Sequence, residues 1–218
     1  MTPFDLTVLR ERTAVAILRS TDTRYFAATA ATLARTGITL MEFALTTPGA
    51  ARAILDIRAD LPDEVHLGAG TVLDAAAADA AADAGAAFLV TPAVVPEVIT
   101  AAASTGTGVL CGAYTATEVL TAHRAGALAV KIFPAGREGA AYCRALRDPL
   151  PDVPLVPTGG VDAGNAAAFL RAGACGLGLG RGLIGDATEG GSQRALADRA
   201  ARLLDTIRQG REPQPCTS

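Results

Sequence analysis

Two charged residues interrupt apolar runs of this sequence, and their types point to chemistry. Lys131 is the only lysine among 19 lysines and arginines, and it lies in the apolar run of residues 128–134. An arginine stays protonated under ordinary conditions, whereas a lysine shielded from water can lose its proton and attack a carbonyl carbon. Glu42 lies in a second apolar run, residues 38–44, where a carboxylate could move protons. A structural ion pair is the alternative, but burying two charges costs more than apolar packing, so we favour a catalytic pair.

Polar and glycine-rich turns follow several other apolar runs. Those after the last two runs, at residues 157–161 and 178–182, suit a phosphate, because backbone N–H groups approach an anion closely at glycines and helix starts. The alternative is that these glycines only make tight turns.

Residues 180–185 also match the dinucleotide fingerprint G-x-G-x-x-G. That fingerprint needs a helix and a second strand after it, and only one helical stretch, at about residues 192–209, remains. The two histidines, His66 and His123, have no acidic or cysteine cluster at ligand spacing around them. We therefore expect no nicotinamide cofactor, no other cofactor and no metal.

Composition excludes several classes of protein. A net charge of −3 argues against nucleic-acid binding, which depends on clustered basic residues. The four cysteines form no C-x-x-C pair, which is typical of reduced thiols in a cytoplasmic protein. No signal peptide and no apolar segment long enough to cross a membrane is apparent.

The elements that must position Lys131 and Glu42 follow from periodicity. Eight β-prone runs, beginning near residues 13, 38, 65, 87, 108, 128, 153 and 175, alternate with Ala-rich helical stretches. This predicts a (β/α)8 barrel over residues 1–210, with a short helix at about residues 3–11 before the first strand and a disordered tail at 211–218. An open doubly wound sheet is the alternative. Strand alternation points Ala129, Lys131 and Phe133 inward. It also places Glu42 on the opposite face of its strand from Met41 and Phe43.

Five motifs in order resemble the class I 2-keto-3-deoxy-6-phosphogluconate (KDPG) and 4-hydroxy-2-oxoglutarate aldolase family. They are Glu42, G-A-G-T-V at 68–72, T-P at 91–92, K-I-F-P at 131–134 and P-T-G-G-V at 157–161. The family's fold is a (β/α)8 barrel. The resemblance implies a Schiff base at Lys131, proton transfer by Glu42, and a phosphorylated 2-keto acid as substrate. It also implies these substrate contacts: Arg19, Thr71, Pro92, Phe133, Thr158, Gly159, Gly160, Gly180 and Arg181.

The resemblance favours cleavage of KDPG to pyruvate and glyceraldehyde 3-phosphate, because Thr158 before the glycine pair is similar to the gluconate branch. The galactonate epimer and unphosphorylated 4-hydroxy-2-oxoglutarate are alternative substrates. Two positions depart from the family pattern: Thr46 stands where many members carry arginine, and Arg181 where a serine is common. From a different class, a phosphate-binding isomerase or synthase would use Lys131 without a covalent adduct. Family members usually form homotrimers, so we expect one here.

Overall fold

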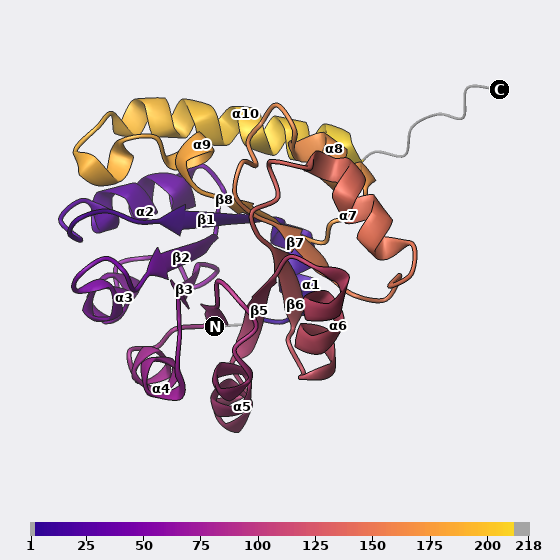
Figure 1. Ribbon diagram of the computed structural model, residues 1–218. Coiled ribbons are helices and arrows are strands. Elements are labelled where there is room, and N and C mark those ends of the chain that lie inside the picture. Colours follow the sequence, from indigo (N-terminus) through magenta and orange to yellow (C-terminus); the bar gives the residue numbers. More distant parts are fainter. Residues whose placement is uncertain (1–2, 212–218) are drawn as a thin grey trace.

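Eight parallel strands alternate with helices and close into a barrel in the computed structural model, which describes residues 3–211 (Figure 1). The strands run in the order β7-β6-β5-β4-β3-β2-β1-β8. An isolated bridge between Thr158 and Gly178 and a bond of 2.9 Å from the N–H of Cys175 to the carbonyl of Leu155 join β7 to β8. The predicted barrel is confirmed, and the open-sheet alternative is wrong. The strands are β1 (Ala14–Leu18), β2 (Leu40–Ala44), β3 (His66–Gly70), β4 (Phe88–Val90), β5 (Gly108–Ala113), β6 (Ala129–Ile132), β7 (Leu155–Pro157) and β8 (Leu177–Leu179).

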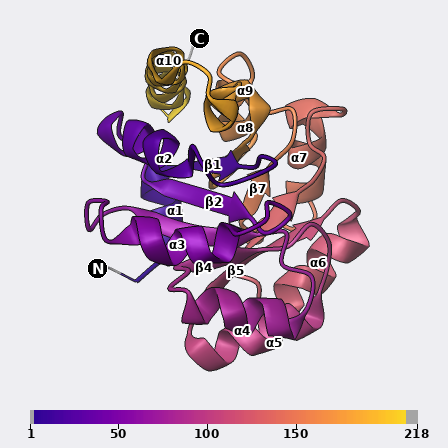
Figure 2. The ribbon, with the colours of Figure 1, turned by 90° about the vertical axis from the view of Figure 1, so that its left-hand side faces the viewer.

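The helices form a ring around the strands (Figure 1). The longest, α10, packs along α2 and α8 (Figures 1 and 2). No helix of residues 3–211 is long and apolar enough to cross a membrane. The helices are α1 (Leu6–Arg12), α2 (Phe26–Arg35), α3 (Ala50–Arg58), α4 (Ala75–Asp83), α5 (Pro96–Thr105), α6 (Ala116–Arg124), α7 (Gly139–Arg147), α8 (Ala166–Arg171), α9 (Arg181–Ile184), the 3-10 helix η1 (Ala187–Glu189) and α10 (Gln193–Arg211).

Both ends of the described chain differ from the prediction in detail. Helix α1 begins at Leu6 because the Asp5 carboxylate accepts the N–H of Val8 at 2.8 Å and caps the helix there. The prediction of disorder from residue 211 is wrong for Arg211, which ends α10 and donates to the carbonyls of Arg10 and Glu11. Residues 212–218 lie outside the described part. The short elements α9 and η1 were not predicted.

Two apolar layers enclose the strands and confirm the predicted alternation. Val130 and Ile132 belong to the layer between strands and helices, whereas Ala129 belongs to the barrel interior with Leu40 and Phe88. Lys131 lies two residues after Ala129 on the same strand and so shares its inward face.

Candidate active site

Glu42 carries an unpaired carboxylate oxygen inside the barrel. The residue is 2% exposed, and Oε1 has no hydrogen-bond partner among residues 3–211. The carboxylate lies over the next strand: a Cβ built on Gly70 would be 1.8 Å from Oε1. A buried acceptor without a partner costs about 1–3 kcal/mol, so such groups are usually kept for a function.

Lys131 is the second charged residue of the interior. It is 7% exposed, lies between Gly112 of β5 and Val156 of β7 in the sheet register, and has Nζ 5.4 Å from the centroid of the Phe133 ring. Within the described chain neither Lys131 nor Glu42 forms an ion pair. The structural ion pair considered as an alternative is therefore wrong. Two buried charges stand near apolar walls with no charged partner.

The loop after β4 closes the wall beside Lys131. A Cβ on Gly112 would lie 2.2 Å from the carbonyl carbon of Pro92, so only glycine allows this approach. Thr91 fixes the loop, because its buried hydroxyl accepts the N–H of Gly112 at 3.0 Å and donates to the carbonyl of Ala93 at 2.6 Å. The sequence marks Thr91 as the end of a strand but does not reveal this positioning role.

Phe133 stands at the mouth of the barrel. Its side chain is 42% exposed, which is unusual for a large apolar residue of this chain. The ring lies near the Nζ atom of Lys131 and also faces the loop after β7. A Cβ on Gly159 in that loop would lie 3.0 Å from the Cε2 atom of the ring. Phe133 thus links the amine to the glycine pair after β7.

Arg19 and Thr71 meet at the same mouth from β1 and β3. Arg19 Nη2 donates to Thr71 Oγ1 at 3.3 Å, and Arg19 is exposed. Thr71 has a φ of 58°, which is a strained value for a β-branched residue. This pair offers a guanidinium and a hydroxyl to an anion.

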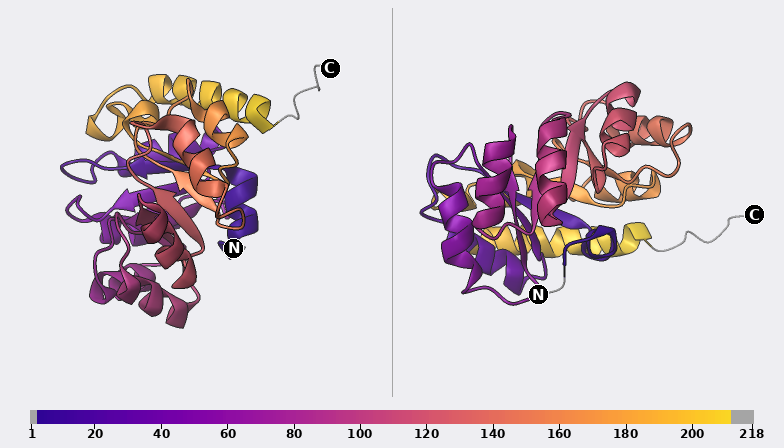
Figure 3. Two further views of the ribbon diagram at one scale, coloured as in Figure 1. Left: turned by 45° about the vertical axis from the view of Figure 1, so that its right-hand side comes forward. Right: turned by 90° about the horizontal axis from the view of Figure 1, so that it is seen from below.

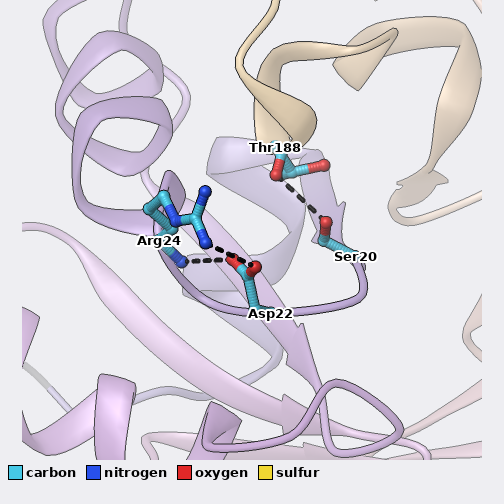
Figure 4. Close-up of polar contacts among 4 residues, drawn as sticks. All are labelled: Ser20, Asp22, Arg24 and Thr188. Carbon is cyan, nitrogen blue, oxygen red and sulfur yellow. Dashed lines mark hydrogen bonds and ion pairs between the residues drawn. The ribbon is translucent and has the colours of Figure 1, made fainter.

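The loop after β1 is tied down on both sides of Arg19. The Ser20 N–H donates to Thr47 Oγ1 at 3.1 Å. Figure 4 shows the second contact, in which the Ser20 hydroxyl donates to the carbonyl of Thr188 at 3.1 Å. Thr188 in turn donates to the carbonyl of Arg19 at 3.1 Å. Ser20, Thr47 and Thr188 are not recognisable from the sequence, because their role depends on contacts between distant segments. An Asp22–Arg24 ion pair at 3.6 Å, also drawn in Figure 4, closes the exposed end of this loop.

The glycine pair after β7 is held open by its neighbours. Gly159 and Gly160 have φ values of 82° and 78°, and a Cβ on Gly160 would lie 2.7 Å from the Cα of Gly136. The N–H of Gly136 donates to the carbonyl of Gly159 at 2.7 Å, and the Asn165 amide donates to the carbonyl of Gly160 at 2.8 Å. In both bonds a carbonyl oxygen of the glycine pair is the acceptor, so neither bond uses a backbone N–H group of the pair.

Three further predicted residues lie at the ends of β7 and β8. Thr158 is 3% exposed and donates its hydroxyl proton to the carbonyl of Val156 at 3.2 Å. Gly180 is the N-cap of α9, and a Cβ there would meet nothing within 4 Å. Arg181 follows as the exposed first residue of α9. Glu42 and Lys131 thus lie within β2 and β6, and the other predicted site residues lie just after the carboxyl ends of strands, on one end of the barrel.

The described residues hold no group of three His, Cys, Asp or Glu side chains that could bind a metal ion. The arrangement instead offers a shielded amine, an unpaired carboxylate and loops able to bind anions. Such a set can form a covalent imine with a keto acid and move protons beside it.

Known proteins that are similar to this chain are described as aldolases. The sequence model of the family described as KDPG and KHG aldolase matches residues 6–190. A probable 2-dehydro-3-deoxy-6-phosphogalactonate aldolase of Rhizobium meliloti (strain 1021) is 37% identical over 194 residues, which cover 88% of this chain and 92% of that protein. A 2-dehydro-3-deoxy-phosphogluconate aldolase of Pseudomonas aeruginosa is 38% identical over 139 residues, 63% of either chain. A solved structure described as native KDPGal superimposes with a TM-score of 0.85 at 35% identity, covering 90% of this chain and 95% of that one.

Proposed function

The chain belongs to the KDPG and KHG aldolase family, whose members are lyases, and on that premise we propose that it is a class I aldolase. In this proposal Lys131 forms the Schiff base and Glu42 moves the protons. The observation that supports it most is the pair of buried charged side chains inside the barrel, for which residues 3–211 provide no ion-pair partner. A structural role would leave both charges as an uncompensated cost.

The reaction follows from these two groups. The free amine of Lys131 attacks the C2 ketone of the substrate, and loss of water gives an imine. The protonated imine draws the electrons of the C3–C4 bond, so cleavage leaves an enamine in place of a costlier enolate. Glu42 accepts the C4 hydroxyl proton as the aldehyde leaves, and it serves the earlier proton transfers as well. Protonation of the enamine at C3 restores the imine, and hydrolysis of this imine releases pyruvate and returns the free amine of Lys131.

Anion-binding groups at the mouth would hold the two ends of the substrate. Thr71, beside the Arg19 guanidinium at 3.3 Å, would bind the carboxylate next to the reacting ketone. Pro92 and Phe133 would wall the reactive carbon. The phosphate would lie against the backbone at Gly159, Gly160 and Gly180, near the Arg181 side chain, which can add a charge-assisted bond. Because Thr46 stands where many family members carry arginine, Arg19 would supply the guanidinium at the carboxylate end.

We propose the gluconate epimer as substrate, with glyceraldehyde 3-phosphate as the second product. Thr158 donates its proton to Val156, so its oxygen still has lone pairs that can accept a substrate hydroxyl. The galactonate epimer is the second candidate, because the Rhizobium relative and the superimposed structure carry its name. Unphosphorylated 4-hydroxy-2-oxoglutarate is the third, and it would leave the glycine loops unused.

Borohydride reduction with pyruvate tests the covalent step. We expect one reduced pyruvyl adduct on the peptide that contains Lys131, measured by intact and peptide mass spectrometry. Lys131→Met should form none, which controls for reaction at the N-terminus. Folded wild-type enzyme without an adduct would contradict the proposal and favour an isomerase or synthase that works without a covalent intermediate.

The epimer is tested by comparing kcat/KM for the two phosphorylated substrates. We expect the wild type to prefer the gluconate, and Thr158→Val to shift the ratio by about tenfold or more towards the galactonate, since it removes the hydroxyl and keeps the shape. A wild-type preference for the galactonate would overturn this choice of epimer and leave the Schiff-base chemistry intact. By resemblance we also propose a cytoplasmic homotrimer, which light scattering of the purified enzyme would test for its subunit number.

A further inference from the structure

An open cavity of about 370 Å³ lies at the amino ends of β7 and β8, at the opposite end of the barrel from the candidate active site. Its wall is formed by the last turns of α1, α7 and α10 and by the segments that lead into the two strands. In Figure 3 the indigo α1 lies beside the yellow end of α10 at this end of the molecule. The charged and sulfur-bearing lining residues are Arg10, Arg147, Arg211, Asp152 and Cys175.

Three arginines line this cavity from three separate helices. None of them forms an ion pair within residues 3–211. Among residues 3–211, Asp152 is the only carboxylate in the lining, so this part of the chain gives the cavity an excess of positive charge. A bound anion would neutralise this excess of positive charge.

Two of the three arginines are already held in place. Arg147 donates to the carbonyls of Gly173 at 2.7 Å and Pro151 at 3.1 Å. Arg211 donates to the carbonyl of Glu11 at 3.1 Å and also to the carbonyl of Arg10. All these acceptors are neutral, so the contacts fix the guanidiniums without cancelling their charge. Each fork has five N–H donors and keeps some of them for a ligand.

Two of these arginines also affect the pKa of the thiol of Cys175 in the cavity wall. Burial raises the pKa of the Cys175 thiol to about 11, while Arg10 and Arg147 act in the opposite direction. Both guanidiniums therefore lie within electrostatic range of one point in the cavity wall.

From this arrangement we infer that the cavity binds a small phosphorylated anion. Guanidinium forks that approach from several directions match the oxygens of a phosphoryl group better than those of a single planar carboxylate. A volume of about 370 Å³ admits a diphosphate or a short phosphorylated acid. Bound there, the anion would bridge α1, α7 and α10 and stabilise the amino end of the barrel. This site is independent of the proposed catalysis.

Arg10 is the residue to change. Its guanidinium makes no hydrogen bond in the described structure, so its loss should leave the fold intact, whereas Arg147 and Arg211 hold helix ends. Arg12 provides a matched control, because it is exposed on the same last turn of α1 but does not line the cavity. Arg10→Gln and Arg12→Gln lose the same charge from the same helix.

The test is a titration with inorganic diphosphate at constant ionic strength, followed by the thermal midpoint Tm. Wild type and Arg12→Gln should show the same concentration-dependent rise in Tm, and Arg10→Gln should need about tenfold more diphosphate for an equal rise. Arg10→Lys, which keeps the charge and loses the fork, should fall between them and serves if the glutamine variant folds poorly. Diphosphate bound at the glycine loops would stabilise all variants equally. Equal titrations for Arg10→Gln and Arg12→Gln would therefore overturn the inference.

Discussion

Replacing Gly70 by alanine should displace the carboxylate of Glu42. Both proposed catalytic residues, Glu42 and Lys131, remain in the sequence of this variant. Gly70 ends β3, and it is not among the glycines with positive φ, so the backbone itself accepts a side chain. The obstacle is the neighbouring carboxylate. A methyl group at this position would lie 1.8 Å from Oε1, 2.3 Å from Cδ and 2.4 Å from Cγ of Glu42.

The size of the effect follows from these distances. Ordinary contact begins at 3.4 Å, so Oε1 at 1.8 Å must retreat by about 1.6 Å. A displacement of about 1 Å in a catalytic group can cost on the order of 10²-fold in rate. We therefore expect kcat for aldol cleavage to fall by about 10²-fold or more. The free energy of unfolding should change by only about 1 kcal/mol, because the carboxylate can swing towards the open mouth.

Gly68→Ala is the matched control, since Gly68 lies two residues earlier on the same inward face. Its new methyl group would lie 2.5 Å from the ring of Phe88, deep in the closed interior, where overpacking costs about 1–3 kcal/mol. Steady-state cleavage and urea unfolding should thus separate the two variants: Gly70→Ala loses rate, and Gly68→Ala loses stability. If Gly70→Ala kept kcat within about threefold of wild type, the placement of the Glu42 carboxylate would not matter for catalysis.

Three further outcomes are expected. Lys131→Met should abolish cleavage and raise the free energy of unfolding by about 1 kcal/mol or more in urea, because it replaces a buried charge without a charged partner; a less stable variant would mean that Lys131 has a structural role. Thr91→Val should lower the free energy of unfolding by about 1–3 kcal/mol, because the buried N–H of Gly112 loses its acceptor, while Thr91→Ser should behave like wild type. Burial raises the pKa of Cys143 and Cys175 to about 11, so their alkylation by iodoacetamide should keep accelerating up to about pH 11; a plateau near pH 9 would contradict this. The unfolded chain releases these protons first, so stability should fall between pH 9 and about 11.

Sequence alone could predict the barrel and the inward faces, because both follow from short periods. The alternation of Val130 and Ile132 against Ala129 and Lys131 is visible in the sequence, and the two apolar layers of the structure repeat it. Lys131 stood out by composition and Glu42 by its apolar surroundings. Such features can be predicted from the sequence because they depend only on neighbouring residues along the same strand.

The contacts that orient the mouth could not be predicted in the same way. The bonds of Ser20 to Thr47 and Thr188 join segments 27 and 168 residues apart, and nothing near Ser20 marks it. The terminal position of Arg211 predicts disorder, yet its bond to α1 joins residues that are 200 positions apart in the sequence. Hydrogen bonds between distant segments appear only once the fold brings those segments together.

The inward glycines explain how a packed barrel keeps room for chemistry at one end. Gly70 leaves the space that the Glu42 carboxylate occupies, Gly112 admits the Pro92 loop, and a Cβ on Gly178 would lie 2.1 Å from Thr158 Oγ1. Lower in the barrel, Gly68 makes room for an apolar ring, so the same residue type there serves packing. A glycine run on a strand can therefore mean a turn, a packing partner or a site, and only the neighbour across the sheet distinguishes them. Here the neighbour at the carboxyl end is a carboxylate with an unpaired oxygen, and this is why Gly70 is a sharper test of the proposed mechanism than the glycines of the turns.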